Sequence, residues 1–442
     1  MLSGADGVTG RKPRLPSGCA HAPAPVAVRQ VTHPIEFDDV AEIVLVVTSS
    51  RGGSSLLMKA LQDHCDCLTL QGECTPYLRK AGLSFPTSGS GSDSLSAAHV
   101  SAEKRRFLEA TLLRDLGTAC TTWEHLDVCA FKQQVGWRLS VQWPELTLQQ
   151  DDINAAVDRS ITLSKSDDSA GIALECLQTH LIRELAGVDP RIRTTAYDHD
   201  VITGRAAPTD EPPAEVVEEP PFVIPRPWRA ASDSDLSRRS VILKSPSSAY
   251  RLEFWRRLLP DARFRILHLV RNPAASINGL YDAWLFNGFY SHRVGGLKIQ
   301  GYSHLPGGRE WWKLDLPPGW HDYRTAPLER ICAFQWYSAH RHVLDYISRD
   351  GSTEDSYAMV NLESFVDKAT RSSTLKSIAE WLGVQCDLGG VEKLPRVMAT
   401  AAPRPGRWMD RQGLIESVLD DGILELARAL GYSGTPARWD RQ

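Results

Sequence analysis

Short apolar runs and longer segments with helical periodicity alternate along the chain. Residues 43–47 are continuously apolar and rich in β-branched side chains, and a polar, glycine-containing turn follows at 48–53. Such a run is typical of a strand that is buried on both faces of a sheet. Small hydroxyl residues then begin an apolar stretch, 54–61, in which leucines recur four positions apart, and this pattern predicts a helix.

The same alternation returns in the second half of the chain. The further predicted elements are strands at 241–243, 264–270 and 357–360 and helices at 249–259, 327–348 and 375–382, the last ending before Gly383. Strands that alternate with helices indicate a parallel sheet. We therefore predict an α/β fold in which helices flank the sheet and large insertions separate its elements.

Segments without sustained periodicity lie between these elements. Residues 1–40 are rich in Pro, Gly and Ala and are expected to form a flexible N-terminal tail, so the domain should span residues 41–435. Loops are predicted at 84–96, which is dense in Ser and Gly, and at 203–240, which contains Pro- and acid-rich stretches. The whole insertion, about residues 150–240, should lengthen the fold without dividing its core.

Composition excludes several classes of protein. The chain has 442 residues, of which 42% are hydrophobic and 24% charged, and its formal net charge is −4. These values are ordinary for a soluble globular protein. No apolar run approaches the ~18–20 residues of a membrane helix, and the first 40 residues contain no apolar core of a signal peptide. We expect a cytoplasmic protein with no membrane partner, and the near-neutral charge argues against a nucleic-acid partner. The sequence does not indicate the oligomeric state.

The nine cysteines are odd in number and mostly isolated, which favours reduced thiols over a disulfide framework. Cys65, Cys67 and Cys74 form the only cluster. Their spacing lacks the paired C-x2-C knuckles of structural zinc sites, so ordinary buried thiols are the favoured interpretation over a metal site. We predict no metal.

The turn after the first strand has the composition of an anion site. Its glycines let backbone N–H groups turn inward, the next helix presents its N-terminus, and Arg51 adds a positive charge. The alternative is a plain tight turn with a serine N-cap. The segment is not a G-x4-G-K-[ST] loop, because no lysine precedes Ser54 and Ser55, and a nucleoside triphosphatase is disfavoured.

A basic patch is hidden within the near-neutral average. Between residues 241 and 271 there are seven Lys or Arg residues and two acidic residues. Lys244 and Arg271 both stand where predicted strands end. Ligands of open α/β sheets bind outside those carboxyl ends, so these two cations are candidates for a second part of the anion site.

Taken together, these motifs resemble the sulfotransferases that use 3′-phosphoadenosine 5′-phosphosulfate (PAPS). The similarity rests on the loop 51–55, the strand ending in Lys244-Ser245-Pro246, and the strand 264–270 with Arg271-Asn272-Pro273 after it. The stretch 360–384 and the basic segment 404–408 are similar to later parts of that family. The resemblance implies a P-loop NTPase-like parallel sheet flanked by helices.

The resemblance also implies roles for individual residues. Arg51, Gly52, Gly53, Ser54 and Ser55 would cradle the 5′-phosphosulfate, with Arg51 close to the sulfuryl group. Lys244 would lie near the bridging oxygen, and Arg271 would hold the 3′-phosphate. The family usually has a serine eight residues after that arginine, where this chain has Gly279. The candidates to replace its contact are Ser276, Asn278, Arg404 and Arg407.

A hydroxyl acceptor needs a general base. Glu73 is the first candidate, because Gly72-Glu73 resembles the segment that supplies the base in protein-tyrosine and some bacterial sulfotransferases. The cytosolic branch uses a histidine two residues after the strand-end lysine, where this chain has Pro246. Loop histidines at 292, 304 and 321 stay open as alternatives.

Ten aromatic residues fall between Tyr281 and Tyr323. This region, about 281–323, is a candidate acceptor pocket or lid, and a satellite hydrophobic cluster is the alternative. The leading hypothesis is therefore transfer of a sulfuryl group from PAPS to a hydroxyl of a small-molecule acceptor, such as a natural product. The rivals are a P-loop kinase or other nucleotide phosphotransferase, and a non-catalytic binding protein that retains the fold.

Overall fold

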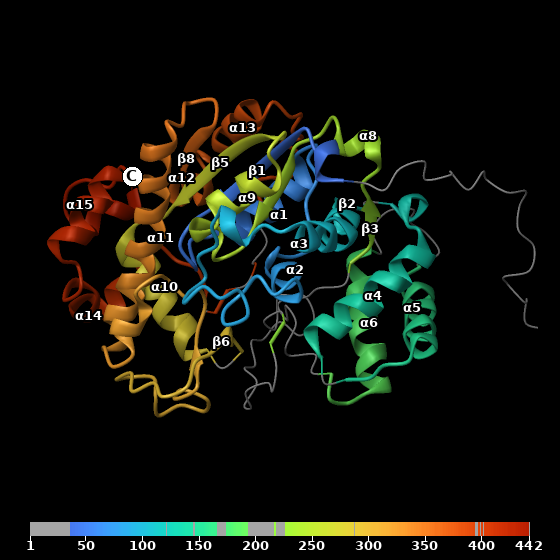
Figure 1. The fold of residues 1–442 in the computed structure, drawn as a ribbon, viewed down its shortest axis with the longest axis horizontal. Coiled ribbons are helices and arrows are strands. Elements are labelled where there is room, and N and C mark those ends of the chain that lie inside the picture. The colour runs from blue at the N-terminus through green and yellow to red at the C-terminus, as the bar shows by residue number, and fades with distance from the viewer. Residues whose placement is uncertain are drawn as a thin grey trace, which may run out of the picture. The chain divides into compact units, whose positions relative to one another are not determined.

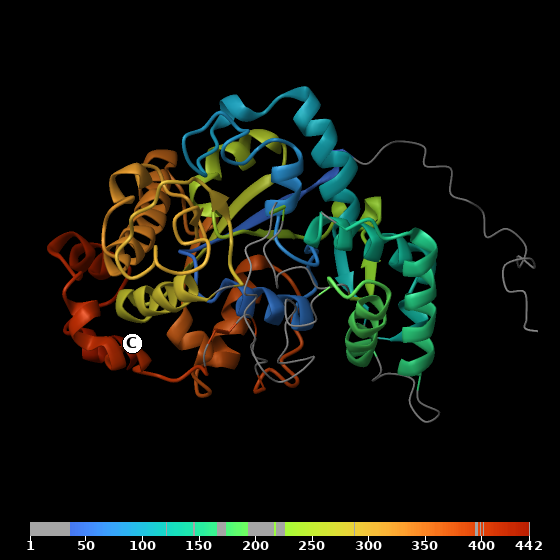
Figure 2. The same cartoon turned by 90° about the horizontal axis from the view of Figure 1, so that it is seen from below.

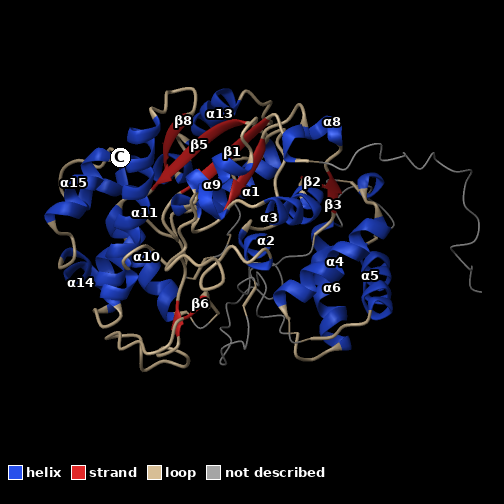
Figure 3. Cartoon of the chain, in the orientation of Figure 1, coloured by secondary structure: helices blue, strands red, loops and turns tan. Residues whose placement is uncertain are grey.

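A parallel sheet forms the centre of the fold in the computed structural model (Figure 3). Its four strands run in the order β4-β1-β5-β8, and the three neighbouring pairs are all parallel. The strands are β1 (Glu42–Val47), β4 (Val241–Lys244), β5 (Arg263–Val270) and β8 (Tyr357–Asn361). The predicted α/β fold with a parallel sheet is confirmed, and all four strands coincide with predicted ones.

The structure describes residues 36–120, 122–144, 146–165, 174–192, 216–217, 226–286, 288–393, 397, 399–400 and 402–441. These residues belong to one compact unit, Ile35–Gln442. None of its described helices is both long enough and apolar enough to cross a membrane.

Helices that follow the strands cover the sheet on both faces. The described chain as a whole contains the helices α1 (Ser54–His64), α2 (Thr75–Lys80), α3 (Ala102–Leu108), α4 (Val128–Gln142), α5 (Gln150–Ser164), α6 (Leu174–Val188), α8 (Asp233–Leu236), α9 (Leu252–Leu258), α10 (Pro273–Leu285), α11 (Leu328–Asp350), α12 (Leu362–Val366), α13 (Arg371–Leu382), α14 (Gln412–Glu416) and α15 (Asp421–Ala429). The helices predicted around α1, α9, α11 and α13 are confirmed, and α13 ends at Gly383 in the left-handed conformation.

Alternate residues of β1 serve the two faces. Val44 and Val46 pack in one apolar cluster with α1, α12 and α13. Ile43, Leu45 and Val47 pack in a second cluster, with α2, α9 and α11. Because successive side chains of a strand point to opposite faces, a continuous apolar run is needed to serve both.

Helices α4, α5 and α6 form a separate helical group beside the sheet, visible in both views (Figures 1 and 2). They share their own apolar cluster, which includes Phe131, Ile153 and Leu181. Two contacts join this helical group to the rest of the fold. Arg138 of α4 forms a buried ion pair with Asp115, and the ring of Trp137 stacks on that of Tyr77 in α2, with the ring centroids 5.2 Å apart. Sequence analysis left this region without predicted elements.

Several boundary predictions change. Phe37 and Val40 are buried, so the packed unit begins within the segment predicted as a tail, while residues 1–35 lie outside the described residues. Residues 84–96 contain no helix or strand, as predicted. The predicted loop 203–240 is wrong over its last part, which contains α8 and the strand β3 (Trp228–Ala230), paired with β2 (Gly117–Ala119).

Candidate active site

The turn between β1 and α1 carries the conformation that an anion site requires. We call residues 48–55 the anion loop. Gly53, the N-cap of α1, has a φ of +92°, and Arg51 has a φ of +63°. A Cβ on Gly52 would lie 2.0 Å from the Thr48 hydroxyl, so only glycine fits there. The first N–H groups of a helix have no carbonyl partner within it, and the N-terminus of α1 therefore favours an anion.

A cavity of about 710 Å³ lies at the carboxyl ends of β1, β4 and β5. Its volume is in the range of small-molecule sites, and its place at the strand ends is where open α/β sheets bind ligands. It is lined by every site residue predicted from the sequence except Gly52 and Ser276, that is by Arg51, Gly53, Ser54, Ser55, Glu73, Lys244, Arg271, Asn278, Arg404 and Arg407.

Lys244 and Glu73 form an ion pair in the wall of this cavity. Both side chains are nearly buried, with 7% and 12% of their surface exposed. The Lys244 ammonium also donates a hydrogen bond to the Ser55 hydroxyl at 3.0 Å, which links it to the anion loop. The backbone fixes the arrangement, because the Cys74 N–H donates to the Lys244 carbonyl at 3.1 Å and so holds Glu73 beside the end of β4.

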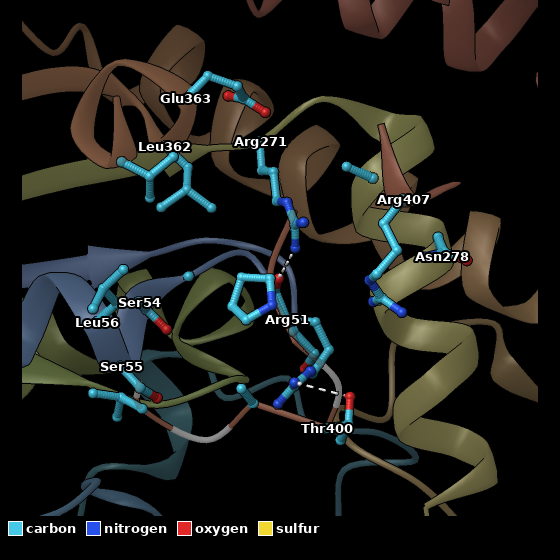
Figure 4. Close-up of a pocket in the computed structure, with 18 of the residues that line it drawn as sticks. Arg51, Ser54, Ser55, Leu56, Arg271, Asn278, Leu362, Glu363, Thr400 and Arg407 are labelled. Atoms are coloured by element: carbon cyan, nitrogen blue, oxygen red, sulfur yellow. Dashed lines mark hydrogen bonds between the residues drawn. The ribbon is translucent and has the colours of Figure 1, made fainter. Parts of the chain in front are cut away.

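Arg51 and Arg271 lie side by side (Figure 4). Arg271 Nη1 donates to the Arg51 carbonyl at 3.0 Å, and the Arg51 guanidinium lies 3.5 Å from the Thr400 hydroxyl. Phe289 supports Arg51 with its ring centroid 5.5 Å away. Burial, assisted by the charges of Arg271 and Arg407, lowers the pKa of Arg51 to about 10. Arg51 is still a cation at neutral pH. A bound anion would offset both the cost of burying this cation and its repulsion by the neighbouring arginines.

The C-terminal arginines are held by acidic partners outside the cavity lining. Arg407 pairs with Asp282 at 2.5 Å, and Arg404 pairs with the exposed Asp410. Arg411, which the sequence analysis missed, also pairs with Asp282, at 2.8 Å. Arg407 and Arg411 are the two ends of one short 3-10 helix, Arg407–Arg411, so both can contact Asp282, and their closeness in sequence was the available signal.

Ser276 and Asn278 were candidates to replace the serine that the resemblance leads us to expect at position 279, and only Asn278 lines the cavity. Asn278 lines the cavity, but its side-chain oxygen accepts a hydrogen bond from Arg411 at 2.6 Å. Ser276 is buried, and its hydroxyl donates to the Arg271 carbonyl at 3.4 Å. Gly279 lines the cavity where a Cβ would lie 3.4 Å from Arg271 Nη1. A side chain at position 279 would therefore contact Arg271.

Glu363 is a cavity residue to which sequence analysis gave no role. It accepts hydrogen bonds from the Asn272 N–H at 3.0 Å and from the Tyr432 hydroxyl at 2.7 Å. These contacts fix the start of α10 directly after Arg271. The residue could have been singled out, because it stands two residues after the strand that ends at Asn361.

Of the candidates for the general base, only Glu73 lies on the wall of this cavity among the described residues. His292 is buried instead, with Nε2 3.2 Å from Asp93 Oδ2. His304 and His321 do not line the cavity. The geometry therefore favours Glu73 over the three loop histidines.

The aromatic segment 281–323 is built mainly as a hydrophobic cluster. Trp284, Tyr302, Trp312 and Trp320 are buried and pack with α10, α11 and the C-terminal helices. None of the ten aromatic side chains lines the described cavity, although Phe289 supports Arg51 from behind. Its role as acceptor pocket or lid stays a prediction.

The cysteine cluster behaves as separate thiols. Cys65, Cys67 and Cys74 are buried and free, and burial is the main cause that raises the pKa of each. Within the described part of the chain, no group of three or more His, Cys, Asp or Glu side chains is placed to hold a metal ion.

The described cavity thus combines an anion loop whose backbone requires glycine, a lysine that bridges this loop to a carboxylate, and the arginines Arg271, Arg404 and Arg407. Arg271 lies next to Arg51 of the loop (Figure 4). Such a site can hold a ligand with two anionic groups. It can also stabilise charge that develops between them, and it can accept a proton at Glu73.

No protein-family model and no curated protein matches the chain. Among solved structures, the chain is similar to a sulfotransferase domain from the Synechococcus PCC 7002 olefin synthase, with 12% identity and a TM-score of 0.32 over 90% of this chain and 96% of that one. It is similar to the same extent to a sulfotransferase domain from the curacin biosynthetic pathway, with 12% identity and a TM-score of 0.31 over 90% and 99%. Likeness at this level assigns no activity, so function must be inferred from the cavity itself.

Proposed function

We propose that the chain transfers a sulfuryl group from PAPS to a hydroxyl group of a small-molecule acceptor. The observation that carries this proposal is the bridge formed by Lys244, which contacts Ser55 of the anion loop at 3.0 Å and pairs with Glu73 in the same cavity wall. A cation between an anion-binding loop and a carboxylate suits a reaction in which a leaving anion and an attacking hydroxyl meet at one point.

The residues divide the chemistry between them. In sulfuryl transfer the acceptor oxygen forms a bond to sulfur while the bond from sulfur to the phosphate oxygen breaks, much as in phosphoryl transfer. Arg51 and the N-terminus of α1 would stabilise the oxygens of the transferred group. Lys244 would stabilise the charge that develops on the leaving phosphate, and Glu73 would take the hydroxyl proton.

The ion pair between Lys244 and Glu73 couples these two roles. While the pair is intact, the carboxylate is held by the ammonium group and is less available to a hydroxyl. An anion that binds next to Lys244 competes with Glu73 for the ammonium. Arrival of the donor should therefore release the base, and this order would limit proton uptake to the loaded site.

Arg271 is proposed to hold the 3′-phosphate of the donor. Its guanidinium is fixed by the Arg51 carbonyl at 3.0 Å, and Arg407 and Asn278 lie on the same side of the cavity. A cavity of about 710 Å³ is large enough for a nucleotide together with part of an acceptor. Two anionic groups of one ligand would then meet Arg51 and Arg271 at the same time.

Isothermal titration with 3′-phosphoadenosine 5′-phosphate, the donor product, tests the donor assignment. We expect saturable binding, and weaker binding of adenosine 5′-phosphate, which lacks the 3′-phosphate. Arg271→Ala should remove most of the difference between the two ligands. Arg330→Ala is the matched control, because Arg330 pairs with Asp420 on the surface with 47% of each side chain exposed. Absence of binding by the unmodified protein would reject PAPS as donor.

Turnover assays separate the rival functions. Lys244→Ala should lower sulfuryl transfer to a panel of hydroxylated acceptors by about 10²–10³-fold, as for other preorganised donors. Binding of ATP that depends on Mg²⁺, with no binding of the donor product, would instead favour a phosphotransferase. Donor binding without transfer to any acceptor would favour a binding protein that retains the fold.

A further inference from the structure

A buried carboxyl group lies directly behind the anion loop. Asp315 is 1% exposed and accepts hydrogen bonds from the Ser50 hydroxyl at 2.5 Å and from the Tyr250 hydroxyl at 3.0 Å. Ser50 precedes Arg51 and lines the cavity, and so does Leu314, which precedes Asp315. The carboxyl group is thus separated from the cavity by a single hydroxyl.

Each end of this hydrogen bond is next in sequence to a strained residue of the backbone. Arg51, with a φ of +63°, and Leu314, with a φ of +65°, are the non-glycine residues of positive φ in the described chain. Left-handed backbone at non-glycine residues persists only when surrounding contacts enforce it, and it clusters at functional sites. The bond between Ser50 and Asp315 joins the two strained segments and is placed to enforce both.

A second carboxylate holds the other side of the same network. Asp93 pairs with Arg251 at 3.0 Å and with His292 at 3.2 Å, and it accepts from the Ser247 hydroxyl at 2.7 Å. It also accepts from the Leu316 N–H at 2.8 Å, next to Asp315. Ser247 and Arg251 follow Lys244 in the chain. The network therefore ties the anion loop to the segment that begins at the strand-end lysine.

The two carboxyl groups differ in charge compensation. Burial opposes ionisation of Asp93, but His292 and Arg251 outweigh it and hold its pKa well below the usual range. Burial raises the pKa of Asp315 to about 7, the Ser50 hydrogen bond opposes this, and the charge of Asp93 adds to it. Asp315 thus titrates near neutral pH beside a carboxylate that stays ionised.

The surroundings of Asp315 supply hydroxyls rather than cations. Ser50 comes from the anion loop and Tyr250 from the segment after β4, and Asp93 lies in the loop that precedes α3. From α11, Gln335 donates to the Asp315 backbone carbonyl at 2.8 Å. The neighbouring Lys313 donates to the Phe286 carbonyl at 2.5 Å. The charged groups behind Asp93 are Arg251 and His292.

We propose that Asp315 is a positioning residue for the anion loop, which in its neutral form holds Ser50 and Arg51 in place for an anion and on ionisation weakens anion binding. The inference rests on the proposed function only in taking the ligand of the cavity to be an anion. When Asp315 is ionised, its negative charge repels an anionic ligand in the cavity, in addition to the repulsion from the charge of Asp93. Binding and protonation of Asp315 therefore favour each other.

The test compares three side chains at position 315 by isothermal titration with 3′-phosphoadenosine 5′-phosphate between pH 6 and pH 8.5. For the unmodified protein, we expect affinity to fall several-fold across this range. Asp315→Asn keeps a neutral group that can accept from Ser50, so its affinity should fall less with pH and exceed that of the unmodified protein at pH 8.5. Asp315→Ala removes the hold on Ser50, and its affinity should be low at every pH.

Controls separate this role from a structural one. Asp322→Asn changes an exposed aspartate in the same region and should keep the unmodified pH profile. The ratio of variant to unmodified affinity at each pH cancels the titration of the ligand. Circular dichroism verifies that each variant is folded. Equal pH profiles for the unmodified protein and Asp315→Asn would overturn the proposal, because a purely structural role cannot produce a difference between them that depends on pH.

Inorganic pyrophosphate, titrated in parallel, distinguishes failure of the inference from failure of the proposed function. One outcome is that the nucleotide does not bind, but pyrophosphate binds with the expected pH dependence and Asp315→Asn loses that pH dependence. In that case the positioning role stands and the donor assignment fails. If neither anion binds at any pH, the inference is overturned together with the anion site.

Discussion

Replacing Glu73 with glutamine changes one charge in the cavity wall and leaves the shape of the side chain nearly unchanged. The carboxylate is 12% exposed and pairs with Lys244, which is 7% exposed. An amide cannot take a proton from a hydroxyl group at neutral pH, and a positioned base typically contributes about 10²–10⁴-fold. We therefore expect kcat for sulfuryl transfer to fall by about 10²–10⁴-fold.

The same substitution should strengthen anion binding. Removing one partner of a buried ion pair costs about 3–5 kcal/mol, because the other charge is left uncompensated. Lys244 keeps its hydrogen bond to Ser55 at 3.0 Å and faces a cavity, so the loss should be smaller, about 2 kcal/mol. A bound anion next to Lys244 removes this penalty. The donor product should therefore bind Glu73→Gln at least about tenfold more tightly, since a factor of ten corresponds to about 1.4 kcal/mol.

Thermal unfolding provides an independent measure of the same energy. For a chain of 442 residues, an unfolding entropy of about 2.1 cal/mol/K per residue means that about 2 kcal/mol lowers Tm by roughly 2 °C. The ligand-free variant should melt about 2 °C below the unmodified protein, and saturation with the donor product should remove this difference.

The assays are isothermal titration for affinity, mass spectrometry of sulfated product for turnover, and a thermal melt with and without ligand. Glu310→Gln is the control, because Glu310 pairs with Arg293 at 2.8 Å on the surface, with 50% and 63% of the side chains exposed. It should leave all three values unchanged. A Glu73→Gln variant with kcat within about threefold of normal would refute the base assignment, and weaker donor-product binding would refute the charge argument.

Three further outcomes are expected. A Cβ at Gly279 would lie 3.4 Å from Arg271 Nη1, so Gly279→Ser should tighten binding of 3′-phosphoadenosine 5′-phosphate by about tenfold in isothermal titration, as a hydrogen bond to a charged group allows. Adenosine 5′-phosphate should show no such gain. Burial lowers the pKa of His268 to about 3, so the unfolded chain takes up a proton below about pH 6.5 that the folded protein refuses. As the pH is lowered below about 6.5, the free energy of unfolding measured in urea should therefore decrease by up to ~1.4 kcal/mol per pH unit. His268→Gln should make this dependence of the unfolding free energy on pH less steep. The thiols of Cys65 and Cys386 lie 3.1 Å apart, so oxidised glutathione that reacts with the less buried Cys386 should lead to a disulfide with Cys65 and release two glutathione thiols. Because burial raises the pKa of Cys65, the reaction should be slow. It is detected as loss of two free thiols that is absent in Cys386→Ser.

The strands and the strand-end cations were predictable because their signals are local. An apolar β-branched run such as 43–47 must lie in a sheet core, and residues directly after such runs must lie at one edge of a parallel sheet. Lys244 and Arg271 therefore fall into one cavity on topology alone. The glycines of the anion loop could be anticipated in the same way, since Gly53 has a φ that other residues avoid.

The partners of these residues were not predictable, because they come from distant parts of the chain. Asp315 and Ser50 form a hydrogen bond although they are 265 positions apart in the sequence, and the contact between Thr400 and Arg51 joins residues 349 positions apart. Neither contact has a local pattern. Helices α4–α6 were missed for a different reason. In α5 and α6 the buried residues recur at helical spacing, as with Ile153, Val157 and Ile161, so a local signal was available there and was overlooked. Helix α4 has no clear apolar stripe, and packing against the other two helices supports it.

The distribution of counter-charges indicates where anion binding should gain the most free energy. Lys244 has Glu73, Arg407 has Asp282, and Arg404 has Asp410, so each of these cations must share or exchange a carboxylate when an anion arrives. Arg51 has no carboxylate at ion-pair distance among the described residues, although the charge of Asp282 acts on it from further away; its guanidinium contacts a hydroxyl and an aromatic ring. A desolvated charge interacts more strongly with an incoming anion than a solvated or paired one. The electrostatic gain should therefore be largest at Arg51, where the anion loop meets α1, while the paired cations mainly set the position and orientation of the ligand.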